Sequence, residues 1–243
     1  MFYPRNNGPF GRGGFRSRYQ YQTLPYGYEG TQASGLIGKV MGLLAFSFLF
    51  AAIGSFVGLT TVDLGFGGGY WIVAIGGLVV LLALNFLIQV SGLNLILLYL
   101  FTFLEGLALS PLLRVYTQYA PNILSEAFLI TAITAFSLAF YAWTTKRDFS
   151  RLGDYLFFGV ILLLIAGIVG FFFHSTFFEL LISVVGIGIF SAYVLFYVQR
   201  AKSMADTLPN AIGLTVSIFI TVLNLFLYIL QLLSILQGGN RRR

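Results

Sequence analysis

Apolar segments of about 20 residues recur along this chain, and they limit its possible folds more than any other feature. Only five charged side chains occur between Ser34 and Thr145, namely Lys39, Asp63, Glu105, Arg114 and Glu126. A helix of about 20 apolar residues is long enough to cross the hydrocarbon core of a bilayer. Charged residues make up 9% of the chain, against roughly 25% in soluble domains. The sequence therefore predicts an all-α, multi-pass membrane protein in contact with the lipid bilayer.

The apolar segments are separated by turn residues and by charges, which together predict seven membrane-spanning helices. Their expected ranges are 36–59, 70–90, 93–113, 123–145, 155–173, 177–198 and 210–236. The connections between them are short, so no soluble domain is inserted. We expect one transmembrane domain over residues 34–237, built as a seven-helix bundle.

Both ends of the chain are basic. Residues 1–33 are rich in Gly, Tyr, Arg, Asn and Pro and lack apolar periodicity, which predicts a disordered tail. Its FGRGGF segment resembles an RNA-binding RGG element, but a basic tail beside a membrane span more often contacts anionic lipid head groups. We therefore expect no nucleic-acid partner. Residues 238–243 form a short basic tip.

The distribution of basic residues predicts the orientation of the chain. With the N-terminus in the cytoplasm, ten basic residues lie inside: Arg5, Arg12, Arg16, Arg18, Lys39, Lys146, Arg147, Arg151, Arg200 and Lys202. Four would lie outside, namely Arg114 and the three terminal arginines. This bias favours a cell inner-membrane protein with a cytoplasmic N-terminus. The terminal arginines disagree with a complete seventh crossing, so the side of the C-terminus stays open.

Glu105 is the one carboxylate deep inside a predicted span. Ionisable groups at this depth are costly and are candidates for a function. Glu105 is therefore either a proton or cation site or a structural hydrogen-bonding group. Pro111 follows in the same segment and removes a backbone hydrogen bond near Leu107, which predicts a kink.

The last predicted span carries a polar stripe, which we define as Ser217, Thr221, Asn224, Tyr228 and Gln231. The spacing of three and four residues places all five on one face of a helix, over roughly 21 Å at about 1.5 Å per residue. Such a face should not contact lipid. It either lines a wetted path or makes hydrogen bonds between helices.

The residue inventory disfavours most enzyme classes. The chain has no cysteine and a single histidine, His174, so we expect no metal site and no cofactor. No pair of aspartates lies within the spans for an intramembrane aspartyl protease, and no lysine lies in the last span for a retinal Schiff base. We expect a protein that is not an enzyme.

Five segments resemble the Bax inhibitor-1 family, over about Lys39 to Gln237. They are FLEGLALSPLL with NILSEAF, TTKRDFSRLGDYLFFG, GIGIFSAYVLFYVQ and SIFITVLNLFLYILQLL. The resemblance implies six helices around a central seventh. It also implies two activities described for family members, which are a pH-sensitive calcium leak and, in bacteria, inhibition of a membrane-bound AAA protease.

The chain departs from the leak-type pattern at two positions. Leak-type members carry a hydrogen-bonded pair of aspartates that senses pH, and Tyr197 and Thr221 occupy those positions here. Neither side chain titrates like a carboxylate near neutral pH. Thr221 resembles the small hydroxyl residue found in the protease-modulating bacterial branch.

Two functions remain open on these grounds. The first is a leak or transport path for calcium ions or protons that lacks the acidic switch, with Glu105, Tyr197, Thr221 and Asn224 as the site. The second is a non-catalytic modulator of a membrane-bound AAA protease, which would bind through the basic tail and the TTKRDFS loop.

Overall fold

The computed structural model describes the whole chain except residues 1–28, 62–63, 66, 174 and 239–243. The described part contains seven helices and no strand. They are α1 (Glu29–Thr60), α2 (Gly68–Leu87), α3 (Leu93–Tyr119), α4 (Pro121–Thr144), α5 (Leu152–Phe173), α6 (Thr176–Lys202) and α7 (Leu208–Gly238). Each is long and apolar enough to cross a membrane. The prediction of an all-α, seven-helix membrane protein is confirmed.

Several helices extend beyond the predicted spans. α1 begins at Glu29, within the segment predicted to be a disordered tail, and α3 continues past residue 113 to Tyr119. These extensions contain polar residues, and hydropathy marks the part of a helix that lies in lipid rather than the end of the helix. The rest of the basic tail, His174 and residues 239–243 lie outside the described residues.

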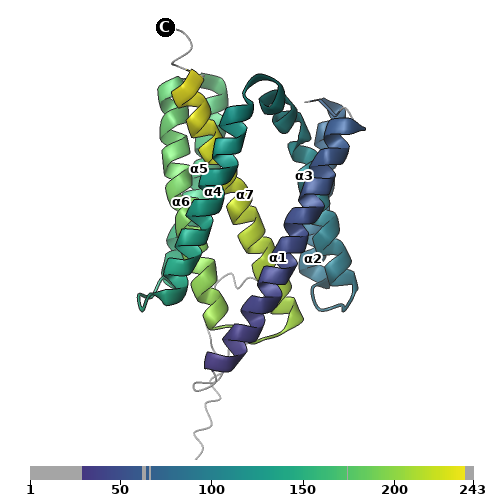
Figure 1. The fold of residues 1–243 in the computed structure, drawn as a ribbon, viewed down its shortest axis with the longest axis vertical. Helices are drawn as coiled ribbons and strands as arrows, with labels where there is room; N and C mark the ends of the chain where they lie inside the picture. Colours follow the sequence, from purple (N-terminus) through teal and green to yellow (C-terminus); the bar gives the residue numbers. More distant parts are fainter. Residues whose placement is uncertain (1–28, 62–63, 66, 174, 239–243) are drawn as a thin grey trace, which may run out of the picture.

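The first six helices form two groups of three, and α7 runs between them (Figure 1). In the first group α1 and α2 both pack against α3, and in the second α4 and α5 both pack against α6. α7 contacts α1 and α3 on one side and α4 and α6 on the other. Within the described part, the backbones of α2 and α5 lie further from α7, and both helices contribute side chains to a cavity that α7 borders.

Glycines bring α1 and α3 into backbone contact. A Cβ atom on Gly106 would lie 1.9 Å from the carbonyl oxygen of Ala51, and one on Gly54 would lie 2.1 Å from the carbonyl oxygen of Phe103. No side chain fits at either position without moving a backbone. Small residues allow this kind of close approach between membrane helices, where van der Waals contact replaces the hydrophobic effect as a driving force.

α3 is one continuous helix that contains Pro111. A proline cannot donate to the carbonyl four residues earlier, which here belongs to Leu107. The hydroxyl of Ser110 donates to that carbonyl at 2.7 Å. The side chain therefore supplies the hydrogen bond that the proline removes, as hydroxyl groups do for broken helices in lipid.

Two cationic side chains cap the C-terminal ends of neighbouring helices. Arg114 donates to the carbonyls of Gly58 and Leu59 at the end of α1, at 3.1 and 3.0 Å. Lys202 donates to the carbonyls of Ala142 and Trp143 at the end of α4, at 2.8 and 2.5 Å. The last carbonyls of a helix have no partner within it and carry partial negative charge, so both contacts are favourable.

The contact between α1 and α3 yields the first prediction. Gly106→Ala should lower the free energy of unfolding by about 1–3 kcal/mol, because the added methyl overpacks a backbone. Gly76→Ala is the matched control, since a Cβ there meets no atom within 4 Å. Alanine is a better helix former than glycine, so the control should keep or gain stability. Thermal unfolding in detergent measures both variants, and equal losses would contradict the prediction.

Candidate functional site

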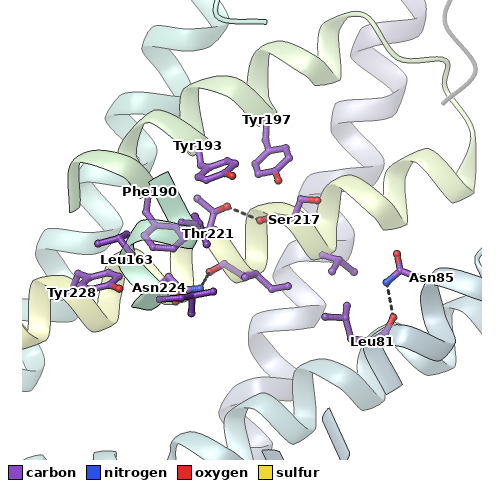
Figure 2. Close-up of a pocket in the computed structure, with 14 residues that line it drawn as sticks. Leu81, Asn85, Leu163, Phe190, Tyr193, Tyr197, Ser217, Thr221, Asn224 and Tyr228 are labelled. Carbon is purple, nitrogen blue, oxygen red and sulfur yellow. Dashed lines mark hydrogen bonds between the residues drawn. The ribbon is translucent and has the colours of Figure 1, made fainter. Parts of the chain in front are cut away.

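A cavity of about 410 Å³ borders α7, next to the middle of its length (Figure 2). Four helices provide its walls. The lining residues are Leu81 and Asn85 from α2, Val160, Leu163 and Leu164 from α5, Phe190, Tyr193 and Tyr197 from α6, and Val216, Ser217, Ile220, Thr221, Asn224 and Tyr228 from α7. Its volume is within the range of small-molecule sites, roughly 300–1,000 Å³.

The polar side chains of α7 are held by their own helix. Ser217 donates to the carbonyl of Gly213 at 2.9 Å, and Thr221 donates to the carbonyl of Ser217 at 2.7 Å. Asn224 donates through Nδ2 to the carbonyl of Ile220 at 2.8 Å. These bonds use the hydroxyl protons of Ser217 and Thr221, so their oxygen lone pairs remain to accept hydrogen bonds.

Aromatic rings from α6 form the wall opposite this polar face. Tyr193 and Tyr197 are stacked with ring centroids 5.4 Å apart, and both face Ser217 and Thr221 (Figure 2). Their phenol groups bring hydroxyl donors to a site whose other wall offers acceptors. The cavity therefore combines both partners of a hydrogen bond within a largely apolar surround.

A glycine of α6 sets the position of the ring at the far end of the cavity. A Cβ atom on Gly186 would lie 2.6–2.7 Å from ring atoms of Tyr228. The ring of Tyr228 also stacks on Phe190, with centroids 5.7 Å apart. The ring of Tyr228 thus packs directly against the backbone of Gly186. A larger residue at position 186 would displace this ring.

The structure brings together most of the residues singled out in the sequence. Tyr197, Thr221 and Asn224 line the same cavity, and so do Ser217 and Tyr228 of the polar stripe. Gln231, the fifth member of the stripe, does not line it.

Glu105 does not belong to this group. It is half-buried on α3 and faces α2, where its Oε1 would lie 3.5 Å from a Cβ atom on Gly77. It does not line the cavity. The sequence grouped Glu105 with Tyr197, Thr221 and Asn224, and the structure separates it because α3 turns this face toward α2 rather than α7.

Two polar lining residues were not singled out in the sequence. Asn85 donates to the carbonyl of Leu81 at 2.8 Å and brings an amide from α2 to the cavity. Tyr193 precedes Tyr197 by four residues and so shares its helix face. A polar residue within the apolar second span, and the tyrosine spacing in the sixth, were the available signals.

No lining residue of the cavity is acidic or basic. Across the described residues, no group of three or more His, Cys, Asp or Glu side chains is placed to hold a metal ion. The cavity can therefore offer neutral oxygen and nitrogen ligands together with aromatic and aliphatic surface. It has no charge with which to balance a bound anion or divalent cation.

Most of the described basic side chains lie at one end of the bundle, which we call the basic end and define by Lys146, Arg147, Arg151, Arg200 and Lys202. Two other ionisable side chains meet at this end of the bundle. Lys39 Nζ of α1 lies 3.0 Å from a carboxylate oxygen of Asp206, in the connection between α6 and α7. This ion pair ties the first helix to the start of the last one.

Gln199 of α6 holds the loop between α4 and α5. Its Oε1 accepts a hydrogen bond from the amide of Phe149, and its Nε2 donates to the carbonyl of Arg147. Within this loop the amide of Ser150 donates to Asp148 at 2.8 Å, which lowers the pKa of that carboxyl below its usual value. Asp148 therefore stays ionised above pH 5, and its contact with Ser150 is lost only as the pH falls through this lowered pKa.

Comparison with known protein sequences identifies the family of this chain. The family described as "Inhibitor of apoptosis-promoting Bax1" matches residues 33–238. An uncharacterized protein of Campylobacter jejuni is 32% identical over 88% of this chain and 94% of its own length. Protein lifeguard 4 of Mus musculus is 30% identical over 66% of each chain, and the Golgi anti-apoptotic protein of Vaccinia virus is 30% identical over 59% of each. The match to the family covers nearly the whole described bundle, and the chain is therefore a multi-pass membrane protein of the Bax inhibitor-1 family.

Proposed function

We propose that this protein is a cation leak, for calcium ions or protons, whose path runs beside α7 and lacks a pH switch. The observation that carries the proposal is the cavity itself, because it places four members of the polar stripe on a shared free volume at bilayer depth. Polar groups in a membrane are costly unless they are satisfied or wetted.

The chemistry of the lining suits a path better than a storage site. Oxygen lone pairs of Ser217, Thr221 and Asn224 replace part of a hydration shell, as neutral oxygens do in ion filters. A tight calcium site uses carboxylates as well, and the cavity lining has none. We infer weak binding and passage rather than tight calcium binding.

The lack of a pH switch follows from the residues at the two positions where a leak-type member would carry aspartates. Tyr197 and Thr221 line the same cavity from α6 and α7. A phenol and an aliphatic hydroxyl both keep their protons between pH 5 and 8. The carboxyl group of Glu105 lies outside the cavity, against α2.

A second function, modulation of a membrane-bound AAA protease, is supported by the basic end. Lys146, Arg147 and Arg151 are exposed there, and the two hydrogen bonds of Gln199 hold the backbone that carries them. A cationic loop held in one conformation loses less entropy on binding a partner than a free loop does.

We also propose that the protein lies in a bacterial inner membrane with its basic end in the cytoplasm. The basic end holds most of the described cations. Arg114, near the C-terminal end of α3, lies at the opposite end of the bundle. Cytoplasmic loops carry an excess of lysine and arginine.

The leak proposal predicts a calcium flux into protein-containing liposomes that changes little between pH 5 and 8. The double variant Tyr197→Asp, Thr221→Asp should gain a steep pH dependence, because two adjacent carboxylates share a proton and separate when it leaves. Thr221→Ser is the matched control and should behave like the natural protein, since it keeps the hydroxyl.

Glu105→Gln tests the separation of Glu105 from the path, and it should leave the flux and its pH profile unchanged. A steep pH dependence in the natural protein that disappears in Glu105→Gln would place the switch on α3 and contradict the proposal. Absence of flux under every condition would favour the protease-modulating function instead.

The role of Gln199 predicts how the cationic loop responds to protease. Gln199→Leu removes two hydrogen bonds, each contributing about 1 kcal/mol. Trypsin should therefore cleave after Lys146 or Arg147 roughly 30-fold faster, because cleavage requires local opening. Gln118→Leu, at an exposed position of α3, is the control and should not change the rate. An unchanged rate in Gln199→Leu would show that this side chain does not hold the loop.

The proposed orientation can be tested with single cysteines, because the natural chain has none. Ser150 lies at the basic end and Thr117 near the opposite end, and both are exposed. An impermeant thiol reagent added to intact cells should label Thr117→Cys and spare Ser150→Cys. The reverse pattern would place the basic end outside the cell.

A further inference from the structure

The lining of the cavity beside α7 reaches the outer surface of the bundle at α5. α2 and α5 both contribute to its lining, but among the described residues these two helices make no contact with each other. On α5, Leu163 is 5% exposed and the adjacent Leu164 is 64% exposed, and both line the cavity. The wall thus continues from the protein interior to the lipid-facing surface. This continuity is what a route from the bilayer to the polar stripe would require.

The lining changes from apolar to polar between α5 and α7. α5 contributes only aliphatic side chains, whereas α7 contributes Ser217, Thr221 and Asn224. Tyr193 and Tyr197 lie over this polar wall (Figure 2). A ligand that fits both parts has a hydrocarbon chain at α5 and a polar head group at α7.

The head group of a resident lipid must be uncharged, because it gives up its water on binding, whereas an ion that passes through the proposed leak keeps part of its hydration shell. The lining contains no lysine, arginine or histidine to pair with a phosphate or carboxylate, and no acid to pair with an amine. Burying an unpaired charge carries a large desolvation cost. Hydroxyl groups fit instead, because Ser217 and Thr221 have already donated their protons to backbone carbonyls and can accept, while the tyrosine hydroxyls can donate.

We propose that the cavity binds an uncharged lipid with a hydroxylated head group, of the monoacylglycerol class, which enters from the bilayer between α2 and α5. The glycerol hydroxyls contact the polar wall of α7, and the start of the acyl chain lies along Val160, Leu163 and Leu164. This inference goes beyond the proposed leak and does not depend on it, since binding is measured without any flux.

Photolabelling in nanodiscs tests the proposal directly. The probe is a monoacylglycerol with a diazirine in its acyl chain, and the comparison probe is a fatty acid with the same chain and diazirine, used at a pH at which its carboxylate is ionised. The monoacylglycerol probe should label cavity residues of α5 and α6, identified by mass spectrometry, and excess unlabelled monoacylglycerol should compete. The ionised fatty acid should label these residues far less.

Two cavity variants and one control complete the test. Ser217→Trp fills the cavity and should abolish the competed labelling. Ser137→Trp carries the same change at an exposed position of α4 and should leave the labelling intact. Asn224→Leu keeps the cavity but removes an amide, so it should reduce the competed labelling about fivefold, the equivalent of one hydrogen bond. This variant keeps the test decisive if Ser217→Trp does not fold.

Three results would overturn the proposal. The first is labelling that spreads over the lipid-facing helices and is not competed, which would indicate general contact with lipid. The second is labelling of cavity residues that Ser217→Trp and Asn224→Leu both leave unchanged. The third is equal labelling by the ionised fatty acid, which would show that the site does not select an uncharged head group. A protein that binds the probe but shows no calcium flux would contradict the leak and leave this proposal standing.

Discussion

Backbone contact between α1 and α3 is the constraint on which the rest of this structure depends. Lipid chains are as apolar as the side chains they surround, so membrane helices associate through close packing and hydrogen bonds rather than through the hydrophobic effect. Gly54 and Gly106 allow that packing here. α3 also packs against α2, and α1 and α3 of this group both contact α7.

The hydrocarbon core of a bilayer contains little water, and this explains how polar groups are arranged in the bundle. The side chains of Ser217, Thr221 and Asn224 are bonded to carbonyls of their own helix, so each is partly satisfied without a partner from another helix. Full charges lie elsewhere, as in Arg114 and Lys202, which cap helix ends. The result is a cavity that is polar yet uncharged, and both the leak without a pH switch and the uncharged lipid follow from that property.

Much of the fold could be predicted from the sequence, and part of the site could not. Hydropathy located all seven helices, but it missed the start of α1 at Glu29, because the residues there are polar and lie outside the apolar segment. Helical periodicity placed the polar stripe on one face, and four of its five members line the cavity. Periodicity within one helix carries no information about the neighbouring helix. The contribution of Asn85 and the position of Glu105 outside the cavity were therefore not visible in the sequence.

What the sequence by itself determined is therefore local. Apolar length defines a membrane span, and three- and four-residue spacing defines a helix face, because both depend only on the geometry of a single helix. Which faces meet was decided by the tertiary structure. The glycines allow the backbones of α1 and α3 to touch, Glu105 lies beside Gly77 of α2, and side chains from four helices enclose the cavity. These relations come from packing between residues far apart in the chain, and no local pattern contains them.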